Sequence, residues 1–175
     1  NLLNRLDANA ELDPISDIWL AYIAQDSQLL NNIKDISADY THPFRRETIQ
    51  VLEWAVDNNS DWKLRYYLAL NYWAKDRNHD ALSLFNSLEN LPNSMPFYIS
   101  RAKLNNTYGK KDRVEKDLER SMNYGKGSWI AYLNAVQYYQ ENKMWKKAGS
   151  FSEKAFQKFS DNFNVPVTEV VVVDI

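Results

Sequence analysis

The stretch LRYYLALNYWAKDRNHDALSLF, which runs from Leu64 to Phe85, carries five aromatic side chains and five leucines around a polar break. It contains neither proline nor glycine. Offsets of three and four residues place Leu68, Ala69 and Tyr72 on one face of a helix. The first half of the stretch therefore predicts a helix that is rich in large apolar side chains.

The second half predicts the other arm of a helical hairpin. Ala81, Phe85 and Leu88 also follow one another at helical spacing. The polar segment AKDRNHD between the arms supplies Asn78 as the expected N-cap of this second helix. The first arm is apolar on more than one side, whereas a two-helix hairpin covers only one stripe of each helix. The remaining apolar surface must be covered by neighbouring hairpins, as in a solenoid.

The same pattern returns along the chain with a nearly constant period. Small residues of the second arm recur at Ala81, Val114 and Ala148. A partial earlier copy has Thr48 one further period before Ala81. A period of this length, about 34 residues, indicates a repeat architecture in which each repeat is one supersecondary unit.

This pattern resembles the tetratricopeptide repeat (TPR) family over about residues 46–162. The segment WKKAGSFSEKAFQKFSDN, residues 145–162, carries the family's small residues and terminal SDN where the family places them. The chain departs from the family at Arg101 and Asn105, which stand where Leu and Tyr are expected, and at Ser152, which replaces an aromatic residue.

The expected fold is all-α, because four glycines and five prolines in 175 residues are few for the turns of an all-β protein. The resemblance implies antiparallel helix-turn-helix repeats stacked in a right-handed TPR-like superhelix. We expect one repeat domain over residues 1–162, with its clearest repeats at 62–94, 95–128 and 129–162. The predicted helices span residues 15–25, 28–38, 46–58, 62–75, 79–89, 96–107, 111–123, 129–141 and 145–158.

The last residues, 163–175, have a different character from the rest. Their Val-rich sequence has strand propensity. We expect an atypical end segment or a truncation artefact here; the alternatives are a strand that pairs with a second copy and a strand that lies along a helical surface. Since the sequence begins with Asn1 and not with Met, we also expect it to be a piece of a longer protein.

A narrower resemblance concerns two segments, HPFRRETIQVLEWAVDNNSDWKLRYYLALNYW and MPFYISRAKL. They are similar to the TPR region of long bacterial proteins that carry an uncharacterised β-rich, mutarotase-like domain upstream of their repeats. This resemblance implies that the parent protein handles carbohydrate.

Composition and motifs argue against several function classes. The net charge of −2, without a basic run, is unlike a nucleic-acid-binding surface, and the chain lacks a run of about 18 apolar residues that would span a membrane. Cysteine is absent, and the two histidines, His42 and His79, show no zinc-ligand spacing. Carboxylates at 115, 117 and 119 alternate with basic residues, which predicts a solvated helix face. We expect neither an enzyme nor a cofactor or metal site, and the compartment stays open.

In the TPR family the inner, concave surface is lined mostly by the first helix of each repeat. The resemblance maps these binding positions onto residues of three successive repeats. An aromatic pair there, Tyr66 and Trp73, either holds an extended peptide or a sugar, or packs between repeats. The expected concave-face residues are Lys63, Tyr66, Leu70, Trp73, Ile99, Lys103, Asn106, Leu133, Gln137 and Gln140.

The leading functional prediction is a non-enzymatic TPR-type scaffold that binds a protein, a peptide or another domain of the same chain. The Lys/Asn/Arg clamp of chaperone-binding TPR modules is missing, since Tyr66, Leu70, Lys103 and Gln137 stand at the corresponding positions. One alternative is an accessory helical repeat region of a carbohydrate-binding or glycan-processing protein. A second alternative is a hydrolase with acidic residues in its groove.

Overall fold

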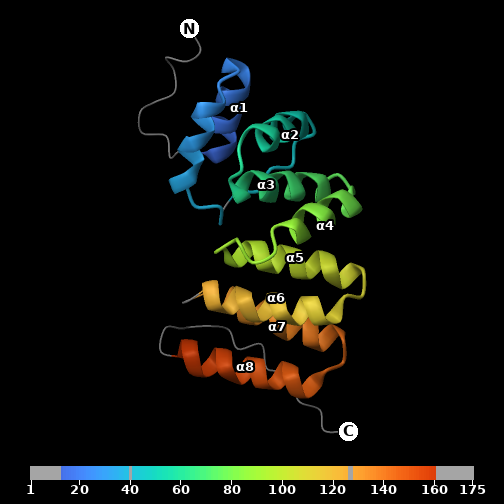
Figure 1. Ribbon diagram of the computed structural model, residues 1–175. Coiled ribbons are helices and arrows are strands. Elements are labelled where there is room, and N and C mark those ends of the chain that lie inside the picture. The colour runs from blue at the N-terminus through green and yellow to red at the C-terminus, as the bar shows by residue number, and fades with distance from the viewer. Residues whose placement is uncertain (1–12, 40, 126–127, 161–175) are drawn as a thin grey trace. The chain divides into compact units, whose positions relative to one another are not determined.

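The computed structural model describes residues 13–39, 41–125 and 128–160, and within these residues it contains helices and no strand (Figure 1). The all-α prediction is confirmed, and eight of the nine predicted helices lie within two residues of their expected ends. The Val-rich segment 163–175 lies outside the described residues. The helices are α1 (Pro14–Ala24), η2 (Ser27–Asp35), α2 (Glu47–Asn58), α3 (Trp62–Trp73), α4 (Asn78–Ser87), α5 (Met95–Thr107), α6 (Lys111–Tyr124), α7 (Ile130–Glu141) and α8 (Trp145–Phe159).

The chain packs into two compact units, Asn1–Asn93 and Ser94–Ile175. Helices α1 to α4 belong to the first unit and α5 to α8 to the second. The boundary between the units coincides with the predicted boundary between the repeats 62–94 and 95–128. The single domain over residues 1–162 and its superhelical stacking stay predictions.

The first two helices begin as their sequences dictate. The Asp13 side chain accepts hydrogen bonds from the backbone of Ile15 and Ser16, and Pro14 is the first helical residue of α1. The second predicted helix, 28–38, is instead the 3-10 helix η2. Its buried residues, Leu30 and Ile33, are three residues apart, which matches the three-residue turn of a 3-10 helix.

Helix α3 is buried on nearly all sides, as the apolar residues around its circumference predicted. Nine of its twelve residues are buried, including Leu68 and Ala69. Within the first unit it packs against both α2 and α4. Tyr66 packs against Phe85 of α4, with ring centroids 6.1 Å apart. The stretch from Leu64 to Phe85 therefore supplies much of the core of the first unit.

Three hairpins of the chain close with the same turn. Asp76, Gly109 and Lys143 have the left-handed backbone conformation, with φ of 59°, 65° and 57°. In each case the next residue donates its backbone N–H to the carbonyl five residues earlier, over 2.9, 3.1 and 2.8 Å. This is the Schellman pattern of a helix C-terminus. The turns recur with the same period as Ala81, Val114 and Ala148, so the sequence period corresponds to a repeated structural unit.

This turn also corrects the predicted N-cap of α4. Asn78 is the first residue of α4, and its N-cap is Arg77, which makes no side-chain cap hydrogen bond. Because the Schellman turn leads directly from α3 into α4, there is no extended residue at which an Asn side chain could cap. Arg77 instead pairs with Asp80 across 2.7 Å.

The core of the second unit joins its four helices. A cluster of buried residues brings together α5, α6, α7 and α8, and Met122, Met144 and Phe151 pack against it. Tyr139 stacks on Phe151 with centroids 5.2 Å apart. The buried members of the cluster are Ala102, Val114, Leu118, Ala135, Tyr138, Tyr139 and Ala148.

A buried ion pair connects α5 and α6 beside this cluster. Arg101 donates from Nε and Nη2 to the two carboxylate oxygens of Asp117, over 2.8 and 2.6 Å. Both side chains are buried. The predicted solvated face of α6 is therefore wrong for Asp117. The pair also accounts for the departure from the family pattern at position 101, because the charge that replaces an apolar residue has a bidentate partner.

We predict opposite effects for the same substitution at two glycines. Gly109→Ala should lower the free energy of unfolding by about 1 kcal/mol, because alanine is strained at positive φ. Gly149→Ala should raise it by about 0.5–1 kcal/mol, because Gly149 lies inside α8 and a Cβ there would contact nothing within 4 Å. Urea unfolding followed by circular dichroism measures both, and equal signs would contradict the assignment of the turn.

A second prediction concerns the buried ion pair. Asp117→Asn should destabilise the protein by about 3–5 kcal/mol, because it leaves the Arg101 guanidinium buried without its counter-charge. The matched control is Glu115→Gln, which removes an exposed partner of Lys147 and should cost at most about 1 kcal/mol. Urea midpoints of the two variants compare the two costs. Equal losses would show that the Arg101–Asp117 pair has no special role in the second unit.

Candidate functional site

A groove of about 190 Å³ lies in the second unit, where α5 and α7 approach each other over α6. Apolar side chains of all three helices form part of its wall, and polar side chains of α5 and α7 form the rest. Its lining residues are Ile99, Ala102, Lys103, Asn106, Val114, Leu118, Asn134, Gln137, Tyr138 and Glu141.

The polar part of the groove combines amide groups with one charge of each sign. Gln137 donates from Nε2 to Glu141 Oε1 over 2.9 Å, and Asn134 donates from Nδ2 to the carbonyl of Ile130 over 2.8 Å. Both amide oxygens stay available to a ligand as acceptors. Side-chain amides offer a donor and an acceptor together, as a peptide group does. The groove therefore suits a ligand with alternating donors and acceptors.

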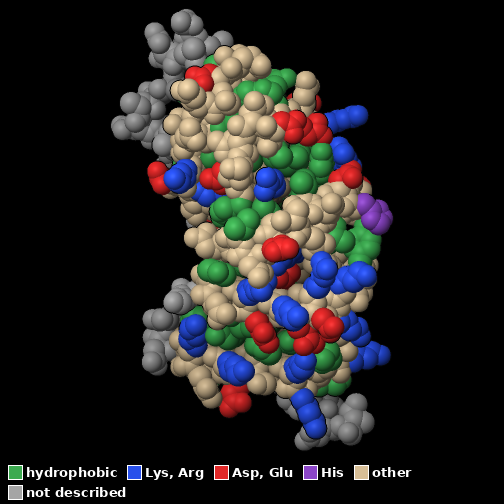
Figure 2. All heavy atoms as spheres, viewed as in Figure 1, with side chains coloured by type: hydrophobic (Ala, Val, Ile, Leu, Met, Phe, Trp, Pro, Cys, Tyr) green, Lys and Arg blue, Asp and Glu red, His purple; other side chains and the backbone are tan. Residues whose placement is uncertain are grey.

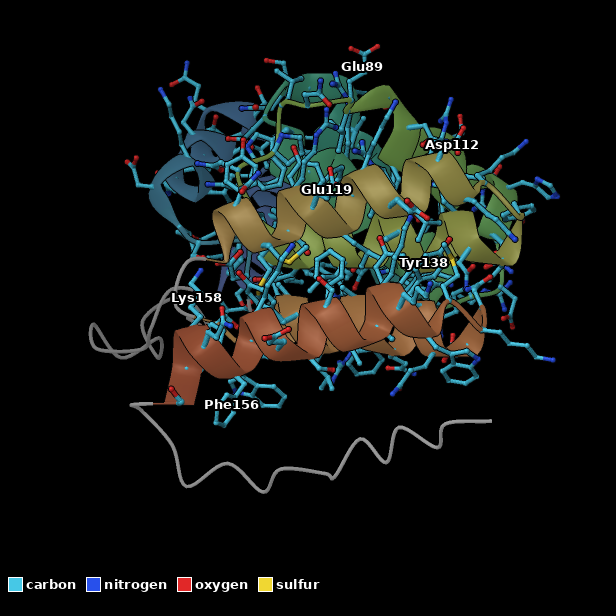
Figure 3. The ribbon with its side chains drawn as sticks, turned by 90° about the horizontal axis from the view of Figure 1, so that it is seen from below. Glu89, Asp112, Glu119, Tyr138, Phe156 and Lys158 are labelled. Carbon is cyan, nitrogen blue, oxygen red and sulfur yellow. The ribbon has the colours of Figure 1, made fainter. Side chains whose placement is uncertain are left out.

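Tyr138, labelled in Figure 3, also lines the groove. Its side chain is 5 % exposed, and its hydroxyl has no hydrogen-bond partner among the described residues. Burial raises the pKa of Tyr138, and the carboxylates of Glu115 and Asp112 raise it further. A buried hydroxyl without a partner costs about 1–3 kcal/mol. Because the oxygen itself is buried, the side chain meets the groove with its other atoms.

Four of the predicted concave-face residues meet in this groove: Ile99, Lys103, Asn106 and Gln137. The other two predicted residues of the second unit, Leu133 and Gln140, do not line it. The reason lies in the repeat. The predicted residues of α5 face α7. The equivalent residues of α7, one period later, lie on the side of α7 that faces away from α5. Only Gln137 lies far enough around α7 to reach back to α5.

The four predicted residues of the first unit have mainly structural surroundings. Lys63 is buried and donates from Nζ to the carbonyls of Ile33 and Lys34 at the end of η2, over 2.8 and 2.5 Å. There it stabilises the negative end of that helix. Leu70 is buried too, and Trp73 packs edge-on against a phenylalanine of α4.

The predicted aromatic pair is not an exposed surface. Tyr66 has no exposed area and packs against Trp62, Tyr67 and Phe85. These contacts lie within the α3–α4 hairpin, so they support packing for Tyr66 but do not test packing between repeats. Its ring has no face available to a peptide or a sugar.

Sequence reasoning missed six groove residues, namely Ala102, Val114 and Leu118 on α5 and α6, and Asn134, Tyr138 and Glu141 on α7. Asn134 and Glu141 lie three and four residues from Gln137, so they share its helix face. Extending the helical period from Gln137 could have identified Asn134 and Glu141. Tyr138 gives no such signal, because a tyrosine at a core position reads as packing.

Other chemically suggestive groups do not gather into a site. His42 lines a second cavity, of about 440 Å³, in the first unit, together with Asp13, Trp19, Phe44 and Arg45 and five further residues. None of the predicted binding residues lies there. Across residues 13–39, 41–125 and 128–160, the structure shows no group of three or more potential metal ligands. No described helix is long and apolar enough to cross a membrane.

Charged side chains of both signs are mixed over the second unit on the face seen in Figure 2. The exposed pair between Lys147 on α8 and Glu115 on α6, at 2.8 Å, is one example. This mixture is typical of a solvated surface, where such pairs contribute little to stability.

A polar cluster in the first unit has a structural explanation. The Tyr72 hydroxyl donates to Glu53 on α2 over 2.5 Å, and the Arg77 guanidinium lies over the Tyr72 ring at 3.8 Å. Arg77 also approaches Glu53 at 3.9 Å. The cluster fastens the α3–α4 turn to α2. Burial raises the pKa of Tyr72 to about 12, and the hydrogen bond to Glu53 and its charge contribute.

This shift predicts a loss of stability in alkali. The Tyr72 phenol has a pKa near 12 in the folded state and near 10 in the unfolded state. Its contribution to the free energy of unfolding is therefore complete below about pH 10. The contribution decreases as the pH rises from about 10 to about 12, because the unfolded state loses its proton first. Tyrosinate absorbance is titrated for wild type and for Tyr72→Phe, and the difference between the two curves reports the ionisation of Tyr72. This ionisation should occur near pH 12. Ionisation near pH 10 would contradict the prediction.

Comparisons of the chain with protein-family models, with curated proteins and with solved structures found no match.

Proposed function

We propose that this protein is a non-enzymatic, TPR-like helical repeat scaffold whose α5–α7 groove binds an extended peptide segment. The segment belongs to a partner protein or to another domain of the same chain. The observation that carries the proposal is the convergence of Lys103, Asn106 and Gln137 from two successive first-arm helices onto one groove. The right-handed superhelical stacking of the repeats is part of the same proposal.

The chemistry of the groove favours a peptide in an extended conformation. Such a peptide presents backbone N–H and C=O groups that no internal hydrogen bond satisfies. The amides of Asn106, Asn134 and Gln137 can donate to and accept from these groups. Ile99 and Leu118 offer an apolar floor for alternate side chains. Lys103 and Glu141 supply charges of opposite sign.

The repeated hairpins support the scaffold part of the proposal. The Schellman turns at Asp76, Gly109 and Lys143 recur with the sequence period. Consecutive hairpins of this kind bury one another's apolar faces and present their first arms side by side. The carbohydrate alternative rested on the narrower resemblance and on exposed aromatic residues, and of these aromatic residues Tyr66 is buried.

A peptide selection tests the proposed function. Peptides selected from a random display library with the wild-type protein should bind the variant Asn106→Ala/Gln137→Ala at least about tenfold more weakly, which is about 1.4 kcal/mol or the loss of one to two hydrogen bonds. The matched control is Asn123→Ala/Gln28→Ala, which removes an exposed asparagine and glutamine outside the groove. It should bind within about twofold of wild type.

A third variant separates binding from folding. Tyr138→Phe removes a buried hydroxyl that has no partner among the described residues, so it should leave the unfolding free energy unchanged or higher. The same variant should bind the selected peptides within about twofold of wild type, because the hydroxyl is buried and does not reach the groove. Selected peptides that bind the groove variant and the control equally would show that this groove is not the binding site.

A further inference from the structure

Two large aromatic side chains of α8 are exposed to solvent. Trp145 is 64 % and Phe156 is 62 % exposed. They are eleven residues apart, which is about three helical turns, about 16 Å along the axis and about 20° around it. The two rings therefore stand at the ends of one face of α8, which we call the α8 outer face.

The α8 outer face lies beside the buried side of the helix. Ala148 and Phe159 are the buried residues of α8, and they lie about 60° and 40° around the helix from Trp145, in the same direction. Figure 3 shows Phe156 pointing away from the neighbouring helices.

The preceding repeat shows what such a face requires. Met122 on α6 lies one repeat period before Phe156 and packs against the core cluster that includes Tyr139 of α7. Met122 is therefore partly buried within the unit, whereas Lys111, one period before Trp145, is exposed. On α8 the position equivalent to Met122 carries a larger aromatic ring, and the described part of the chain leaves most of it uncovered.

The α8 outer face is complementary to itself. Between the two aromatic ends lie the small residues Gly149 and Ser152, at helical offsets that keep them on the same face. The pair 145 and 156 and the pair 149 and 152 have the same midpoint, between positions 150 and 151. Nothing within the unit requires the glycine, since a Cβ on Gly149 would meet no atom within 4 Å. It permits another helix to approach closely.

Charges beside this face have the same symmetry. Lys146 and Glu153 are exposed and lie on one flank of the face, seven residues apart. Their midpoint falls within one residue of the midpoint of the aromatic pair. In an antiparallel arrangement of two copies, the lysine of each copy therefore lies within about 3 Å, along the axis, of the glutamate of the other.

We propose that the α8 outer face binds a second copy of this chain through a two-fold symmetric, antiparallel α8–α8 contact. In this contact Trp145 packs against Phe156 of the second copy, Gly149 lies opposite Ser152, and Lys146 pairs with Glu153. A two-fold interface uses the same patch on both subunits, and this face has the required order of residues. The inference is independent of the groove.

The expected dimer is weak. Aromatic residues bury about 150–250 Å² each, and about two thirds of each ring is still exposed in the monomer, so the four rings of the two copies account for about 400–650 Å². Stable complexes bury about 1,200–2,000 Å², and smaller interfaces are typically transient. Association should therefore depend on protein concentration and appear between about 10 µM and about 1 mM.

Charge exchange tests the proposed pairing by sedimentation velocity over this concentration range. Lys146→Glu and Glu153→Lys should each weaken dimerisation by about three- to tenfold, because each places like charges together twice. The double variant Lys146→Glu/Glu153→Lys should return to within about twofold of wild type. The two residues are about 10 Å apart within one helix, so a rescue by the second substitution reports contact between copies. A double variant as weak as the single ones would overturn the pairing.

Removal of an aromatic ring tests the face itself. Phe156→Ala should weaken the dimer more than about tenfold. The matched control, Phe44→Ala in the first unit, removes a phenylalanine that is equally exposed, at 64 %, and should leave dimerisation unchanged. A wild-type protein that stays monomeric up to about 1 mM would overturn the proposal. In that case, the accessibility of Trp145 to a fluorescence quencher is measured, with Trp145→Phe to identify its signal. Protection of Trp145 in the monomer would indicate that residues 161–175 of the same chain cover the face.

Discussion

The structure depends on one constraint, which is that no hairpin of this chain can bury its apolar surface alone. Helix α3 shows the constraint most clearly, because nine of its twelve residues are buried and they lie around most of its circumference. Two partner helices in the same unit, α2 and α4, cover it. Small residues such as Ala69 and Ala81, both fully buried, permit this close approach. The repeat follows from this requirement, because the apolar face that one hairpin leaves open is covered by a helix of a neighbouring hairpin.

The buried charged side chains of the described residues lie where the same packing supplies a partner. Arg101 replaces an apolar residue of the repeat pattern, and Asp117 on the adjacent helix meets it with both carboxylate oxygens. Lys63 is buried where the end of η2 offers two carbonyls. Buried charges are tolerated when they are paired and hydrogen-bonded. These substitutions weaken the sequence signature of the repeat without disturbing its packing.

The groove and the α8 outer face both follow from the repetition of the hairpin along the chain. Where one first-arm helix follows another, as α7 follows α5, their adjacent polar side chains enclose the groove over α6. After α8 the described residues contain no further helix, and α8 exposes Trp145 and Phe156. A repeat protein thus offers surfaces of two kinds, one along the repeats and one at their end.

The sequence alone determined the helices, their hairpin pairing and their period, because these depend on local spacing and on the recurrence of small residues such as Ala81 and Ala148. The resemblance to the TPR family also indicated four groove residues, namely Ile99, Lys103 and Asn106 on α5 and Gln137 on α7. Tertiary structure decided which faces are covered. It buried Tyr66 and Asp117, and it brought Tyr138 into the groove. Helical spacing places a side chain on a face, but only the neighbouring helices determine whether that face meets solvent, a partner charge or a cavity.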